Sequence, residues 1–158
     1  MGRGHLIGAA LVVAAALAAA VTAAAATGLQ WKVVAYGTSD ATAGQAPVGY
    51  IAVTKAQEQR FWSLLTPADQ AKLQAVNLQK SGVVAMFLYG MPCVSNVAVS
   101  GVSRTKTVVT IVVRYTKPPV GVAMCVRMGT PYALVGVSRT ALGRPAPTHV
   151  RVVAVARA

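Results

Sequence analysis

Short β-branched runs separated by turns fill the stretch from Val83 to Ser138, and this pattern constrains the fold more than any other feature. The strongest run is TVVTIVVRYTK at 107–117, because valine, threonine and isoleucine favour strands. Further apolar or alternating runs predict strands at 83–89, 94–100, 120–128 and 132–138. Turns containing glycine or proline separate these runs, so we expect antiparallel hairpins, with 120–128 returning beside 107–117.

The sequence on either side of this stretch predicts three more strands and a pair of helices. Alternating or apolar runs indicate the strands, at 29–36, 50–53 and 149–156. Thr54 with Gln57 predicts a capped helix over 55–65, and Thr66 before Pro67 predicts the start of a second helix. The expected fold class is α+β: an antiparallel β-sandwich or half-barrel of about eight short strands, with two helices inserted after the second strand.

The N-terminal segment, residues 1–27, has the composition of an export signal. A basic start at Arg3 precedes an uncharged, alanine-rich stretch that ends with Ala24 and Ala26, the pattern of a secretory signal peptide. Residues 6–26 are also long enough for a retained membrane anchor, since a spanning helix needs about 20 residues. In either case we expect residues 28–158 to form a single exported domain, secreted or held at the membrane.

Export determines how the two cysteines are interpreted. In an oxidising compartment Cys93 and Cys125 are expected to form one disulfide. That bond would close a loop of about 33 residues and stabilise the fold by roughly 3–4 kcal/mol. The alternative is a reactive thiol served by His149, but no acidic residue follows Asp69 to orient the imidazole.

The chain is strongly basic, with 15 Lys and Arg against three acids and a formal net charge of +12. Such a charge attracts anionic partners, here an envelope polymer or lipid, and Arg104, Lys106, Arg114 and Arg127 are candidate anion-binding residues. The alternative is a solvated basic surface with no partner. Nucleic acid is not an expected partner, because aromatic and basic residues are not clearly interleaved as in single-strand binding sites.

No catalytic or metal-binding motif is present in the sequence. It contains no phosphate-binding loop, dinucleotide-binding glycine motif, zinc-protease motif or C-x-x-C pair. Two cysteines and one histidine outside the N-terminal segment are too few for a typical zinc site. We therefore expect a protein that is not an enzyme and uses no cofactor or metal.

The order of strands and turns resembles a known family. The residues that carry the resemblance are LYGMPC (88–93), VAVSGV (97–102), VVTIVVRYTKPPVG (108–121) and TPYALVGVSR (130–139). They are similar to the C-terminal domain of the protease complex subunit PrcB family of exported bacterial proteins, over residues 83–139. The family commonly has a Pro-Thr-Gly-Gly-Tyr turn after the first strand, whereas this chain keeps only Pro92 of that motif.

The resemblance implies an accessory, protein-binding role, directed at an exported protease or another envelope protein, and it brings no catalytic residue. The turns after two of the expected strands are the candidate contacts: Pro92, Val94, Ser95, Asn96, Thr130, Pro131 and Tyr132. The alternative function is a basic surface module that binds an anionic envelope polymer or lipid by charge. Clustering of arginines on one face would support the alternative, and an even scatter would argue against it.

Overall fold

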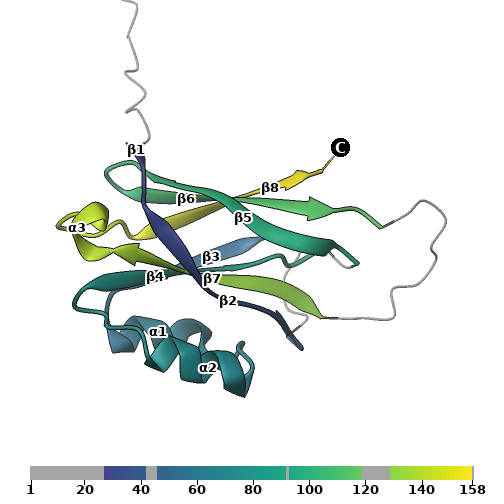
Figure 1. Cartoon of the computed structure of the whole chain (residues 1–158), viewed down its shortest axis with the longest axis horizontal. Coiled ribbons are helices and arrows are strands. Elements are labelled where there is room, and N and C mark those ends of the chain that lie inside the picture. The colour runs from purple at the N-terminus through teal and green to yellow at the C-terminus, as the bar shows by residue number, and fades with distance from the viewer. Residues whose placement is uncertain (1–26, 42–45, 92, 119–128, 158) are drawn as a thin grey trace, which may run out of the picture.

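The computed structural model describes residues 27–41, 46–91, 93–118 and 129–157, which form three stacked layers (Figure 1). Two four-stranded sheets pack face to face, and a pair of helices lies beneath one of them. The expected α+β fold is confirmed, and because the described strands form two separate sheets it is the sandwich alternative.

Sheet A has the strand order β1-β5-β6-β8 and sheet B has the order β2-β7-β4-β3. The strands of sheet A are β1 (Thr27–Gly28), β5 (Ser95–Arg104), β6 (Val108–Thr116) and β8 (His149–Ala156). The strands of sheet B are β2 (Trp31–Ser39), β7 (Thr130–Ser138), β4 (Ser81–Phe87) and β3 (Val48–Ala52). The helices are α1 (Lys55–Trp62), α2 (Pro67–Gln74) and α3 (Arg139–Leu142).

Sheet B is the middle layer, so its central strands are covered on both faces. On β4, Val84 and Met86 belong to the core between the sheets, whereas Val83, Ala85 and Phe87 belong to the core under the helices. Such a strand needs apolar residues at every position, which explains why the run at 83–89 shows no alternation.

Helices α1 and α2 begin at side-chain caps. The Thr54 hydroxyl accepts a hydrogen bond from the Gln57 backbone N–H at 3.3 Å, as the sequence predicted. In a capping box the Gln57 side chain would accept from the N–H of Thr54. Here its Oε1 accepts instead from the N–H of Val53, the preceding residue, at 2.8 Å. Phe61 of α1 and Leu73 of α2 are fully buried and fix the pair against sheet B.

The pairing of β6 differs from the sequence prediction. β6 lies between β5, which is antiparallel to it, and β8, which is parallel to it. These two strands occupy both sides of β6 over its paired length, and the expected hairpin partner, 120–128, lies outside the described residues. β8 takes this place because the chain leaves sheet A after β6, adds β7 to sheet B and returns through α3.

Two smaller boundaries also differ. β5 continues to Arg104, four residues beyond the strand end expected at residue 100. Helix α3 occupies 139–142, between the strands expected at 132–138 and 149–156, and buries Leu142 at the end of the sandwich. None of the described helices has both the length and the apolar character needed to cross a membrane, and residues 6–26 lie outside the described residues.

Candidate functional site

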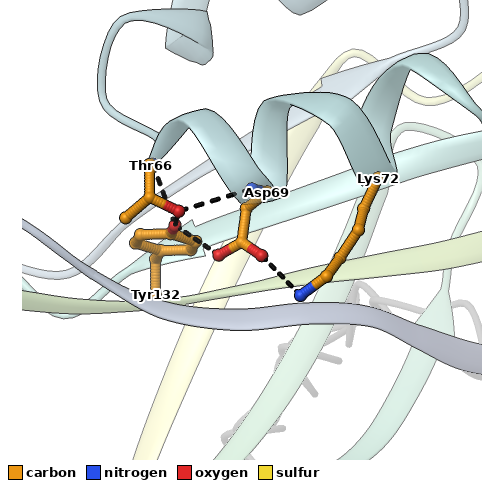
Figure 2. Close-up of polar contacts among 4 residues, drawn as sticks. All are labelled: Thr66, Asp69, Lys72 and Tyr132. Atoms are coloured by element: carbon orange, nitrogen blue, oxygen red, sulfur yellow. Dashed lines mark hydrogen bonds and ion pairs between the residues drawn. The ribbon is translucent and has the colours of Figure 1, made fainter.

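A buried polar cluster joins α2 to sheet B (Figure 2). The Tyr132 hydroxyl, on β7, donates to Asp69 Oδ2 at 2.7 Å and accepts from the Thr66 backbone N–H at 3.2 Å. Lys72 Nζ donates to the other oxygen, Asp69 Oδ1, at 2.7 Å. Thr66 is the N-cap of α2, and its hydroxyl accepts from the Asp69 N–H at 3.3 Å. Both oxygens of this carboxylate are therefore paired.

The pKa values of this cluster follow from burial and pairing. Burial alone would raise the pKa of Asp69, but the hydrogen bonds from Lys72 and Tyr132 and the charge of Lys72 outweigh it. The net pKa of Asp69 is lower than its ordinary value, so the carboxylate is ionised at neutral pH. The pKa of Tyr132 is raised, first by burial and then by its hydrogen bond to Asp69, so its hydroxyl stays protonated.

The hydroxyl and carboxylate residues of this cluster are buried. Tyr132 is 1% exposed and Asp69 is 4% exposed, whereas Lys72 is exposed and Thr66 is partly buried. A Cβ at Gly37 on β2 would overlap the Tyr132 hydroxyl, so the strand above it must carry glycine at this position. The cluster therefore fastens α2 to sheet B rather than presenting a reaction site.

Two of the predicted partner-binding side chains are buried and are not exposed contacts. Tyr132 belongs to the cluster just described, and the Thr130 hydroxyl donates to the Ala41 carbonyl at 2.7 Å. Pro131 is partly buried and pairs with Thr38 of β2. These residues continue β7 instead of forming a loop tip, because β7 begins at Thr130.

The other predicted partner-binding residues lie at the start of β5. Ser95 and Asn96 are exposed there, and Val94 is partly buried against the core between the sheets. Pro92 lies outside the described residues. Of the two candidate turns, the first is therefore exposed at Ser95–Asn96, and the second is largely buried at Thr130–Tyr132.

The predicted disulfide is not tested, because Cys125 lies outside the described residues. Cys93 lies in the turn between β4 and β5 and has a φ of 69°. That value is in the left-handed region, which non-glycine residues seldom adopt. The Cys93–Cys125 bond stays a prediction.

The predicted anion-binding residues do not form one site. The Arg104 guanidinium donates to the Leu142 carbonyl at the end of α3, so it is used inside the fold. Lys106 is exposed in the turn between β5 and β6, and Arg127 lies outside the described residues. Arg114 is exposed on β6, a central strand of sheet A, and it contributes positive charge to the surface of that sheet.

Strand alternation places Arg114 on the outer face of sheet A. On β6, Val109, Ile111 and Val113 are buried between the sheets, so Thr110 and Arg114 point outward. On β8, Val150, Val152 and Ala154 pack against the same core. The alternate residues of β8 and the residue after it therefore point outward: His149, Arg151, Val153, Val155 and Arg157.

Parallel pairing brings these outward residues side by side. Arg151 pairs with Thr110, and Arg114 pairs with Val155. Arg157 continues the ladder past β8, because its N–H donates to the Tyr115 carbonyl at 2.8 Å. His149, Arg151 and Arg157 are exposed, as Arg114 is. We call these four residues (Arg114, His149, Arg151 and Arg157) the basic sheet face.

No acidic residue neutralises the basic sheet face. The three acids of the chain are Asp40, Glu58 and Asp69. Asp40 follows β2 in sheet B, and the other two lie on the helices beneath that sheet. Glu58 and Asp69 already pair with Lys55 at 2.9 Å and Lys72 at 2.7 Å. The helices lie on the far side of the sandwich, and no described element covers the outer face of sheet A (Figure 1).

The sequence reasoning found Arg114 but missed Arg151 and Arg157. The signal that would have found them is the alternation in HVRVVAVAR, which places residues 149, 151 and 157 on one face of a strand. Arg114 could not be joined to them from sequence, because the register between β6 and β8 was not predictable. Among the described residues, no group of three or more His, Cys, Asp or Glu could hold a metal ion.

The family of the chain stays open, and the PrcB resemblance remains a prediction based on residues 83–139. Function has to be inferred from the geometry of the molecule. No protein-family model matches the chain, and no curated protein or solved structure matches it either.

Proposed function

We propose that this protein is an exported, non-enzymatic module that binds an anionic component of the cell envelope through the basic sheet face. The observation that carries the proposal is that Arg114, Arg151 and Arg157 point outward from one sheet whose strands contain no carboxylate. Export rests on the composition of residues 1–27, which act either as a signal peptide or as an anchor through 6–26.

Arginine suits this role because its planar guanidinium can form two parallel hydrogen bonds with a phosphate or carboxylate. Exposed charge pairs are individually weak, at about 0–1 kcal/mol each, so several contacts have to act together. Their attraction is also screened by salt, since the Debye length falls from about 10 Å at 0.1 M to about 3 Å at 1 M. Binding should therefore be strong at low ionic strength and weak at high ionic strength.

The test compares two variants with the same net charge, each made in the chain as it is recovered after export. One variant, R114Q/R151Q/R157Q, removes the arginines of the basic sheet face. The control, K32Q/R60Q/K80Q, removes three exposed cations carried by sheet B and its helix layer. We expect the first variant to lose most of its salt-sensitive retention on isolated envelope material, and the control to keep it. Equal losses in the two variants would show that only net charge matters.

A second proposal is that the domain binds another exported protein, as the PrcB resemblance implies. The observation in its favour is the edge of β5. β1 pairs with β5 only at Ser103 and Arg104, and the Tyr36 hydroxyl accepts from the Val99 N–H at 3.0 Å. Between Ser95 and Ala98 the described residues provide no strand on that side of β5, so an added strand of a partner could pair there.

Affinity capture from the envelope fraction tests this second proposal. A single exported protease that stays bound through a high-salt wash would support pairing at the β5 edge if it is lost when Val97 is replaced by proline in a variant that keeps the circular dichroism spectrum of the unmodified protein. Material that is released by salt and is unaffected by V97P would instead point to the basic sheet face.

A further inference from the structure

We infer that the ligand of the basic sheet face is a single extended polyanion, of the linear phosphate-chain class, lying along β6 and β8. This inference rests on the proposed function and narrows it from an anionic envelope component to one shape of ligand. Three observations support it: the charges form a narrow strip along the strands, neutral residues lie beside the strip on β5, and Arg114 and Arg151 are separated along the strip.

The charges form a narrow strip. Arg157 and Arg151 are six residues apart on one strand, or about 20 Å, and His149 extends the strip to about 26 Å. Arg114 lies on the neighbouring strand, about 5 Å across, at the level of Val155. The strip is therefore roughly five times as long as it is wide, and its long axis follows the strands.

Neutral residues flank the strip on the β5 side. Ala98 pairs with Arg114, and Ser103 pairs with Thr110, so the outward neighbours there are small and uncharged. A bilayer would contact the whole width of the sheet and would gain from several exposed large apolar side chains. Among the described large hydrophobic residues on this face, only Val155 is strongly exposed, at 43%. The distribution favours a ligand one strand wide.

A gap within the strip excludes a small ion as the main ligand. Arg114 and Arg151 are offset by four residues, or about 13 Å along the strands, with Val112 and Val153 between them. One phosphate ion can contact the arginines at one end only. A chain with charges at short regular intervals can contact both ends at once, and the Thr110 hydroxyl beside Arg151 adds a hydrogen-bond donor.

The experiment measures the affinity of the exported chain for long-chain inorganic polyphosphate, tripolyphosphate and orthophosphate over a range of salt concentrations. Three phosphate contacts predict that log K falls with log salt with a slope of about −2, using about −0.7 for each contact on a single strand. Each of R114Q, R151Q and R157Q should reduce this slope by about 0.7. The K32Q/R60Q/K80Q control should leave the slope unchanged. Affinity should rise steeply from orthophosphate to the long chain.

Vesicles of phosphatidylglycerol and phosphatidylcholine in equal amounts separate the two proposals. Vesicle binding that depends on the three arginines, with polyphosphate bound no more tightly than orthophosphate, would overturn the extended-chain inference and leave the proposed function standing. No binding to any of these probes, or equal losses in R114Q/R151Q/R157Q and the control, would overturn both. Long-chain polyphosphate binding that is sensitive only to the face variants supports both.

Discussion

Replacing Tyr132 with phenylalanine removes one hydroxyl from the buried contact between α2 and sheet B and leaves the ring in place. The ring lies 5.4 Å from that of Phe87 between centroids, and this packing is available to phenylalanine as well. The change therefore tests the hydrogen bonds of the hydroxyl and not the apolar core. It is the sharpest available test of whether the polar cluster of Figure 2 anchors the helix layer.

The expected cost follows from the hydrogen bonds of the hydroxyl that are lost, of which the contact with the Thr66 hydroxyl, at 3.4 Å, is the longest. The hydroxyl donates to the ionised Asp69 at 2.7 Å, and a hydrogen bond to a charged group is worth about 1.5–3 kcal/mol. The bond from the Thr66 N–H is longer, at 3.2 Å, and is made to a neutral group, so we expect it to contribute less. Lys72 still pairs with Asp69, which keeps the carboxylate ionised. We expect Y132F to lower the free energy of unfolding by about 2–3 kcal/mol.

Equilibrium unfolding in urea, followed by circular dichroism, measures this cost. The matched control is Y50F, which removes a hydroxyl for which the described residues show no hydrogen bond while keeping its ring contacts with Phe61 and Phe87. A double-mutant cycle with D69N should give a coupling energy of about 1 kcal/mol or more. The anchoring argument would be wrong if Y132F cost no more than Y50F, or if the coupling were close to zero.

Four further predictions concern the same fold. The folded-state pKa of Asp69 is lowered, so its contribution to stability is present at neutral pH and is lost as the pH falls through that pKa, below about 4; D69N should abolish this part of the acid transition. The pKa of Tyr132 is raised, so stability should decline as the pH rises above about 10, and Y132F should remove that decline. G37A should lower the free energy of unfolding by about 1–3 kcal/mol or more, because its methyl group would overlap the Tyr132 hydroxyl; urea titration that found no loss would contradict the close approach. C93S should cost about 3–4 kcal/mol if Cys93 pairs with Cys125, and non-reducing mass spectrometry of the unmodified protein should then find no free thiol.

Local signals predicted much of this fold correctly. Thr54 and Thr66 each cap a helix as their sequence context indicated, because a cap depends on residues within one helical turn. The apolar run at 83–89 became a strand covered on both faces, because the run is too short for a helix and has no polar face. The number and spacing of such runs predicted a sandwich or a half-barrel, and the two separate sheets show that it is the sandwich.

Long-range pairings could not be predicted in the same way. Tyr132 was expected at an exposed tip, yet the hydroxyl meets a carboxylate 63 residues away on a helix. Nearly every residue of β7 after Pro131 is apolar, so the run does not show which face meets the helices. The basic sheet face depends on the register between β6 and β8, and nothing near Arg114 in the sequence indicates a parallel partner that begins at His149.

The parallel pairing of β6 and β8 also determines when the positive surface comes into existence. Val108 pairs with His149, so this contact closes a long loop that includes β7 and α3. Closing so long a loop is entropically costly, so we expect this contact to form late in folding. An incompletely folded chain therefore carries the same arginines without their alignment, so ligand binding would report that the last strand has docked.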